Sequence, residues 1–193
     1  MLKINIYIYS VLFILFMILT YYFTKRKMLR DLLYHTCLAF NKFEVDYWVD
    51  FGSLLGIIRE NDIIMFDMDA DVCIINHDPE KMKKVDEYLR SKNLRVKKEC
   101  NWDAYRGRYN NCFLKLFDAY IDIYMYKTDT INNMYISPIG ENCDISMDLI
   151  GQPKFYKWRG IDIKVPQHMH KTLVYRYGED YNIPKIGNKG RDS

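Results

Sequence analysis

The first quarter of the chain carries two hydrophobic patterns in succession. Residues 4–23 are uncharged and mostly apolar on every side, which predicts a helix of about 30 Å at about 1.5 Å per residue, the thickness of a bilayer hydrocarbon core. Over residues 27–43 apolar positions recur at the helical period with charges between them, which predicts an amphipathic helix. We therefore expect a membrane anchor over residues 1–25 and one further domain over residues 26–193.

A cleaved signal peptide is the competing interpretation of the first segment. The apolar run is long and ends in Thr-Tyr-Tyr-Phe-Thr-Lys-Arg-Lys, which offers no small-residue cleavage site. This ending favours an uncleaved, single-pass anchor. The basic cluster between Lys25 and Arg30 favours a cytoplasmic domain by the positive-inside rule.

Beyond residue 43 the chain alternates between periods of two and of about 3.6 residues. Strand patterns are expected over residues 44–50, 66–75, 94–98, 104–108, 113–117 and 120–126, and a hairpin over 155–166. Helix patterns are expected over residues 54–59, 79–92 and 167–177. Residues 129–147 are polar without a clear period, so we expect a surface loop and a candidate lid. This order of elements predicts an α/β (α+β) fold, a mixed β-sheet flanked by helices.

One predicted strand carries three carboxylates on one face. Because side chains alternate between the faces of a strand, Asp67, Asp69 and Asp71 share one side while apolar residues face the core. Carboxylates two residues apart lie roughly 6.7 Å apart, and at an effective dielectric of about 20 each ionised pair repels by roughly 2 to 3 kcal/mol. A solvated edge strand also carries charges, but Asp122 inside a second hydrophobic strand is more than edge protection requires. The pattern therefore predicts a divalent-cation site.

A glycine turn before a predicted helix adds a candidate anion site. Gly52 and Ser53 would present free backbone N–H groups and a hydroxyl to an anion. Carboxylate oxygens such as those of Asp69 and Asp71 suit Mg²⁺ or Mn²⁺. Together the two elements predict a phosphate bound beside a metal ion.

Composition limits the classes of function. The formal net charge is only +3, and part of it lies beside the predicted anchor, so no basic surface for nucleic acid is indicated. The five cysteines are odd in number and show no close-spaced pair, which predicts neither a disulfide framework nor a zinc site.

Several stretches resemble the LicD/fukutin family within the nucleotidyltransferase-fold superfamily. Residues 47–59 and 63–72 are similar to that family's glycine-rich turn and acidic strand. Residues 121–124 are similar to its third acidic strand, and motifs within 165–184 resemble its C-terminal signature. Phe66 and Met65 replace the family's usual Trp and Pro, and neither change removes a ligand. The resemblance implies a nucleotidyltransferase-like fold.

The resemblance also implies a reaction. A phospho-alcohol group, such as phosphocholine or ribitol phosphate, would pass from a CDP-linked donor to a glycan hydroxyl, with release of CMP. Asp69, Asp71 and Asp122 would hold Mg²⁺ or Mn²⁺, with Asp67 as a secondary ligand, and Asp122 is also the candidate base toward the acceptor. Phosphate contacts would come from Gly52, Ser53, Arg59 and Lys115, although a salt bridge to these carboxylates is an equal alternative for Arg59 and Lys115.

Two other functions and two membrane topologies stay open at this point. A nucleotidyltransferase acting on another acceptor and a non-catalytic membrane-bound relative are the alternative functions. Family members of the secretory pathway imply an ER or Golgi membrane with a lumenal domain, whereas the basic flank of the anchor implies a cytosolic one.

Overall fold

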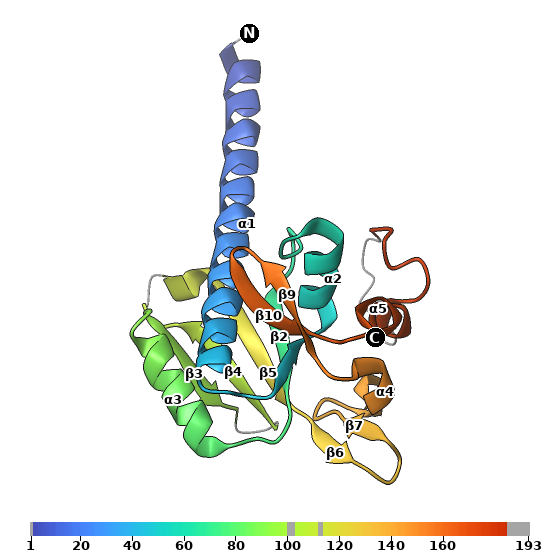
Figure 1. Ribbon diagram of the computed structural model, residues 1–193. Coiled ribbons are helices and arrows are strands. Elements are labelled where there is room, and N and C mark those ends of the chain that lie inside the picture. Colours follow the sequence, from blue (N-terminus) through green and yellow to red (C-terminus); the bar gives the residue numbers. More distant parts are fainter. Residues whose placement is uncertain (1, 100–102, 112–113, 185–193) are drawn as a thin grey trace.

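The two helices expected at the start of the chain are one. The computed structural model describes residues 2–99, 103–111 and 114–184, and it begins with the helix α1 (Leu2–Lys42). The N-terminal half of α1 extends clear of the rest of the protein, and its C-terminal half packs beside the sheet (Figure 1). The helix has no break at residue 25, where we expected the anchor to end. It is long and apolar enough to cross a membrane, a test that a signal sequence would also pass.

The rest of the described chain forms a mixed α/β fold of short elements. The strands are β1 (Tyr47–Val49), β2 (Asp69–Ile74), β3 (Leu94–Lys98), β4 (Ala104–Tyr109), β5 (Tyr120–Met125), β6 (Lys127–Asp129), β7 (Met134–Ile136), β8 (Ile145–Ser146), β9 (Lys154–Trp158) and β10 (Ile161–Val165). The helices are α2 (Phe51–Glu60), α3 (Pro79–Arg90), η1 (Leu114–Phe117), η2 (Glu141–Cys143), α4 (Met147–Ile150) and α5 (Met169–Tyr177).

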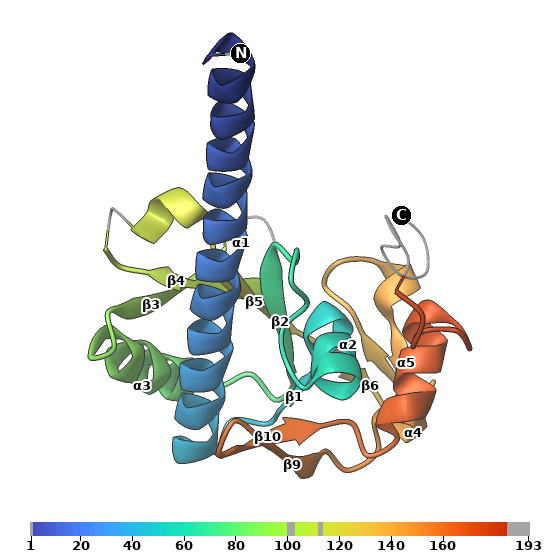
Figure 2. The ribbon, with the colours of Figure 1, turned by 90° about the horizontal axis from the view of Figure 1, so that it is seen from above.

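The central sheet is mixed, as expected. Its strand order is β1-β2-β5-β4-β3, in which β2 and β5 are parallel and the other neighbours are antiparallel. The hairpin β9–β10 and the three strands β6, β7 and β8 form two smaller sheets. Helix α1 packs beside α3, whereas α5 contacts both α2 and α4 to form a second group of helices (Figure 2).

The two faces of β2 are as different as the alternation predicts. Ala70 and Val72 are fully buried and belong to the main core with residues of α1 and α3. Cys73 faces the other way and joins a smaller cluster around Trp48. Parallel pairing of β2 with β5 sets Asp71 in register with Asp122. The sheet therefore presents acidic side chains on the face that the main core does not use.

Three expected elements are wrong in type or extent. Residues 114–117 form the 3₁₀-helix η1 rather than a strand, and residue 113 lies outside the described residues. The expected loop over 129–147 contains β7, β8 and η2, because Tyr135 and Ile145 are buried and the Tyr135 ring packs 5.3 Å from that of Trp48. Strand β2 starts only at Asp69, after a turn in which the Asp67 N–H donates to the Ile64 carbonyl.

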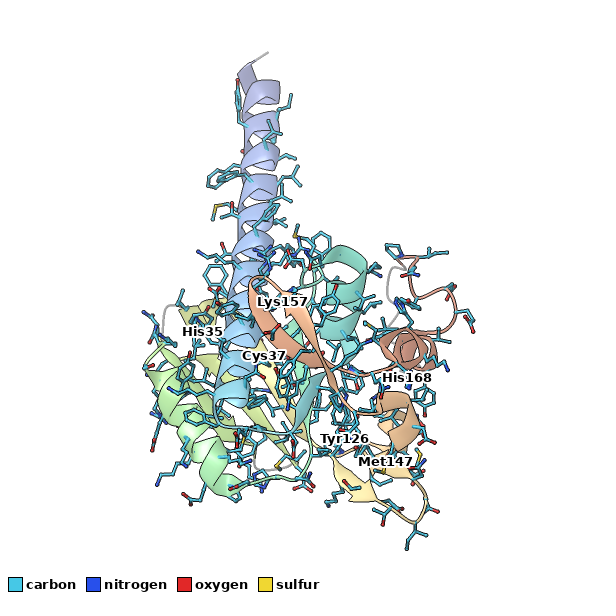
Figure 3. All side chains as sticks on the ribbon, viewed as in Figure 1. His35, Cys37, Tyr126, Met147, Lys157 and His168 are labelled. Carbon is cyan, nitrogen blue, oxygen red and sulfur yellow. The ribbon has the colours of Figure 1, made fainter. Side chains whose placement is uncertain are left out.

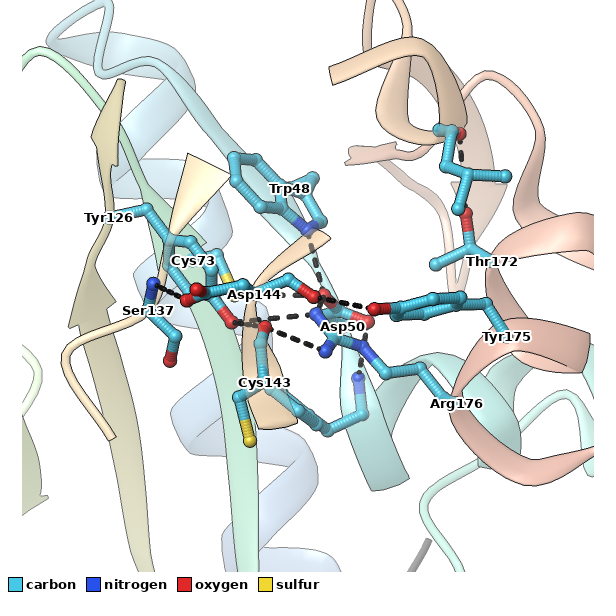
Figure 4. Close-up of polar contacts among 12 residues, drawn as sticks. Trp48, Asp50, Cys73, Tyr126, Ser137, Cys143, Asp144, Thr172, Tyr175 and Arg176 are labelled. Carbon is cyan, nitrogen blue, oxygen red and sulfur yellow. Dashed lines mark hydrogen bonds and ion pairs between the residues drawn. The ribbon is translucent and has the colours of Figure 1, made fainter. Parts of the chain in front are cut away.

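A buried ion pair joins α5 to the start of α2 (Figure 4). Asp50 is fully buried, and its Oδ2 accepts from Arg176 Nη2 at 2.8 Å and from Trp48 Nε1 at 3.0 Å. Its Oδ1 accepts from the Phe51 N–H at 2.8 Å, so Asp50 is also the N-cap of α2. Arg176 further donates to the Cys143 carbonyl at 2.8 Å. The ion pair thus connects three segments that are far apart in sequence: the start of α2, the chain at Cys143, and α5.

The same pair holds a strained turn. Phe51 has a φ of 49°, a left-handed conformation that is costly for a bulky residue. The guanidinium carbon of Arg176 lies 4.3 Å from the centre of the Phe51 ring, and the Phe51 N–H is bound to Asp50. These contacts fix the direction in which the chain leaves β1 and enters α2.

Removing Arg176 should therefore destabilise the protein strongly. We expect Arg176→Met to lower the free energy of unfolding by about 3–5 kcal/mol, because the Asp50 carboxylate would be left buried and unpaired. Urea denaturation of the detergent-solubilised protein, followed by circular dichroism, measures the change. The control is Arg90→Met, which removes the exposed pair with Asp86 and should cost less than about 1 kcal/mol. Equal losses in the two variants would contradict this role of Arg176.

Candidate active site

A cleft of about 750 Å³ opens between α2, the segment before β2, and the chain that follows α5. Asp67 and Asp71 line it together with Arg59, Tyr124 and Tyr177. We call residues 65–68, which form part of its rim, the site loop. The cleft is large enough for a nucleotide-sized ligand and combines apolar walls with a few charged groups, as small-molecule sites do.

Of the predicted acidic residues, Asp67 and Asp71 line the cleft, whereas Asp69 and Asp122 do not line it but are close enough to act on Asp71 electrostatically. Burial, and then repulsion by Asp69, raises the pKa of Asp67 to about 6. Burial raises the pKa of Asp71 well above its usual range, and Asp69, Asp67 and Asp122 raise it further. The pKa of Asp69 is also raised, first by burial and then by Asp122. Each carboxylate would be stabilised by a positive charge placed among them.

Asp122 has a partner that we did not expect. Arg106 of β4 forms a two-pronged contact with it, from Nε to Oδ1 at 2.6 Å and from Nη2 to Oδ2 at 2.9 Å. The guanidinium also lies 4.4 Å from the centre of the Tyr120 ring. Arg106 is in register with Asp122 across the β4–β5 pair. The sequence offered only an arginine within a strand pattern, and the register that brings it to Asp122 is a property of the folded sheet.

These residues fit a hard divalent cation by their chemistry. All the candidate ligands are carboxylates, the oxygen donors that Mg²⁺ and Mn²⁺ prefer. Within the described residues, however, no group of three or more His, Cys, Asp or Glu side chains is arranged so that it could hold a metal ion as it stands. The Arg106 contact explains part of this, since it draws both oxygens of Asp122 toward β4. A carboxylate offers about four lone-pair positions. Arg106 takes one on each oxygen and the Tyr124 hydroxyl donates to Oδ2 at 3.5 Å, so the lone pair left for a metal ion is on Oδ1.

Gly52 and Ser53 lie inside the first turn of α2 rather than in a turn before it. A methyl group added at Gly52 would lie 2.7 Å from Oδ2 of Asp67, so only glycine allows this approach. Ser53 is buried, and its Oγ accepts from the Asp71 N–H at 2.8 Å. Ser53 therefore holds α2 against β2. The first-turn N–H groups of a helix have no carbonyl partner within that helix, which leaves this end of α2 suited to an anion.

The two predicted basic contacts have different outcomes. Arg59 lines the cleft, and its Nη2 donates to Glu60 Oε1 at 2.9 Å. Its Nε is buried and has no hydrogen-bond partner among the described residues, which marks it as a donor available to a ligand. Lys115 belongs to η1, and its side chain lies outside the described residues.

A second cation near the site comes from α1. Lys25 is 1% exposed, and its Nζ lies 3.4 Å from the sulfur of Met68 in the site loop. The carboxylates of Asp67 and Asp69 are within electrostatic range of it. We had assigned Lys25 only to a basic cluster at the membrane. No local pattern distinguishes it from its basic neighbours, since its burial depends on where the site loop packs.

Comparison with known proteins identifies the family. The model of the LicD/FKTN/FKRP nucleotidyltransferase domain matches residues 44–168, more than half of the chain. No curated protein sequence matches significantly.

Two solved structures have a limited likeness to this fold. The crystal structure of ANT(2″)-Ia in complex with adenylyl-2″-tobramycin is 13% identical, with a TM-score of 0.42 over 71% of this chain and 68% of that one. The solution structure of the antibiotic-resistance factor ANT(2″)-Ia is 11% identical, with a TM-score of 0.46 over 78% and 72%. The family match, which includes the glycine turn and all four acidic residues, confirms the resemblance seen in the sequence: the chain belongs to the LicD/FKTN/FKRP nucleotidyltransferase-domain family.

Proposed function

We propose that this protein is a membrane-anchored transferase that moves a phospho-alcohol group, of the phosphocholine or ribitol phosphate type, from a CDP-linked donor to a glycan hydroxyl. The observation that carries the proposal is the gathering of Asp67, Asp69, Asp71 and Asp122 beside a cleft and the N-terminus of α2. Membership of a transferase family supports the class of reaction.

The donor diphosphate would lie between the start of α2 and the acidic group. The N–H groups of Gly52 and Ser53 and the Nε of Arg59 are the candidate donors for its oxygens, since the Phe51 N–H is bound to Asp50. Gly52 lets the phosphate approach the backbone closely. Ser53 positions Asp71 by accepting from its N–H. A Mg²⁺ or Mn²⁺ ion held by Asp69, Asp71 and Asp122 would neutralise charge on the diphosphate and at the reacting phosphorus.

The acceptor hydroxyl would then attack that phosphorus, and the bond to CMP would break. Asp122 is also the candidate to take the hydroxyl proton, and it would do so with the Oδ1 lone pair, in place of a metal contact, because Arg106 and Tyr124 use the others. Arg106 keeps the carboxylate in one orientation, and Tyr124 lies beside it, with the hydroxyl 3.5 Å from Oδ2. Apolar walls around the cleft limit access of water, which would otherwise compete with the glycan.

A screen of donors tests this function directly. The full-length protein with Mn²⁺ should release CMP from at least one of CDP-choline, CDP-ribitol and CDP-glycerol when acceptor glycan is present. Asp69→Asn and Asp71→Asn should each lower this rate by at least about 100-fold, because lost metal ligation costs several kcal/mol of transition-state stabilisation. The matched control is Glu87→Gln on the exposed side of α3, which should leave the rate unchanged. Donor binding without transfer to any acceptor would instead favour a non-catalytic relative.

The raised pKa values predict that the metal-free protein is less stable at a pH at which the site carboxylates are ionised and able to bind a metal ion. Folded Asp67 holds its proton up to about pH 6, whereas its ordinary pKa is 3.8, so metal-free protein loses stability as the pH rises through this window. The raised pKa of Asp71 extends the loss above it. The apparent melting temperature in EDTA should therefore be higher at pH 5 than at pH 7.5.

Asp71→Asn separates the two effects. The neutral amide removes the buried charge, so at pH 7.5 in EDTA this variant should melt about 2–8 °C above the wild type. Added Mn²⁺ should raise the melting temperature of the wild type and leave the variant unchanged. Differential scanning fluorimetry with and without Mn²⁺ measures both. A variant that melts below the wild type in EDTA at pH 7.5 would show that the Asp71 charge is not a cost to the fold.

A further inference from the structure

The site loop packs on α1 at the residues where the uncharged run of the helix ends. The ring of Phe66 meets that of Tyr22 edge to face, with 5.0 Å between centroids. The ring of Tyr21, the residue before Tyr22, stacks on the ring of Phe117, with 5.5 Å between centroids. Phe23 is the last apolar residue of the uncharged run, which Lys25 ends. The loop that carries Asp67 is therefore level with the end of the run.

Polar contacts fix the segment just before the loop to the next turns of α1. Arg26 Nε donates to the Ile63 carbonyl at 2.5 Å, and its Nη2 donates to Glu60 Oε2 at 3.1 Å. Arg30 forms a two-pronged contact with Asp62 at 2.6 and 2.7 Å. These bonds hold the loop and the helix in one arrangement, so the depth of one sets the depth of the other.

The site loop exposes apolar side chains at this level. Phe66 is 64% exposed and Met68 is 48% exposed, on either side of Asp67. Along the N-terminal half of α1 the apolar side chains project on all sides with no other element beside them (Figure 3). That half contains a window of mean hydropathy 1.8 that is not buried by the protein. The exposed apolar surface of the loop is thus continuous with that of the helix through the Tyr22 contact.

We propose that the site loop lies in the interfacial layer of a lipid bilayer, with Phe66 and Met68 among the headgroups and upper acyl chains. Tyrosine side chains favour this layer, so Tyr21 and Tyr22 at the end of the uncharged run place it at their own level. Phe66 contacts Tyr22 and must share that depth. The exposed Lys27 follows within two turns of the helix, where anionic headgroups would receive it.

The cleft would then open at the membrane surface rather than into bulk solvent, because Phe66 and Asp67 both line it. An acceptor carried by a lipid would reach the acidic group without leaving the bilayer surface. This inference goes beyond the proposed reaction and rests on the membrane anchor alone. Its test reads contact with lipid, so it can succeed or fail whether or not the protein transfers a phospho-alcohol group.

The experiment is site-specific photo-crosslinking of the full-length protein. p-Benzoylphenylalanine replaces Leu12, Phe66 or Ile131 in separate samples reconstituted in vesicles of phosphatidylcholine with some phosphatidylglycerol. All three side chains are apolar and more than half exposed, so the replacements should not disturb packing. Leu12 lies in the free half of α1, and Ile131 lies between β6 and β7, at the opposite end of the molecule (Figure 1).

After irradiation, mass spectrometry should find phospholipid adducts at positions 12 and 66 and none at position 131. Adducts at 12 without adducts at 66 would overturn the proposal, since the loop would stand away from the bilayer. Absence of adducts at both 12 and 66 would overturn it as well, because α1 would not be in the membrane. Equal adducts at all three positions would also overturn it, because lipid contact would then not distinguish the site loop from the opposite end of the molecule. The experiment can be repeated in native membranes. There, protein adducts in place of lipid adducts at position 66 would overturn the proposal and assign the surface to a protein partner.

Discussion

The fully buried Asp50 carboxylate is the constraint on which the rest of this architecture depends. A charge in that position is tolerable only with its partners in place: Trp48 and the Phe51 N–H supply them from the same stretch of chain, and Arg176 from the distant α5. These bonds fix the directions of two helices. The bond to Phe51 turns the chain from β1 into α2, and the bond to Arg176 brings α5 beside it. Two of the three segments that form the cleft, α2 and the chain that follows α5, are thus positioned by a residue that does not line it.

The two faces of β2 have opposite effects on stability: the apolar face stabilises the fold, and the acidic face destabilises it. On the core side of β2 the apolar residues bury completely against α1 and α3, which stabilises the strand whatever its other face carries. On the site side, carboxylates raise one another's pKa, and the cations Arg106 and Lys25 offset only part of that repulsion. The fold thus keeps its acidic face short of positive charge. In the reaction that we propose, this excess of negative charge would attract a cation and, through it, the donor diphosphate.

Much of the fold follows from local patterns, and much of the site's detail does not. Alternation in β2, the Asp78 cap of α3, and Gly178 after α5 are local features, and each gives the observed element. The register that pairs Arg106 with Asp122 depends on long-range strand order, which no single segment encodes. The segment 129–147 was predicted to be a loop because its two buried apolar residues, Tyr135 and Ile145, stand among polar residues and show no period. The acidic residues were visible in the sequence, whereas their cationic partners were not.

The continuity of α1 has a mechanical consequence. At about 1.5 Å per residue its 41 residues make a rod of about 60 Å, with no linker between the exposed half and the half bound to the domain. Any tilt of the exposed half is transmitted to the cleft as an equal rotation, because Arg26 and Arg30 hold the neighbouring segment to the rod. Bilayer thickness sets helix tilt in part. With α1 as the membrane anchor that we propose, the thickness of the bilayer would therefore help to set the orientation of the cleft relative to the membrane surface.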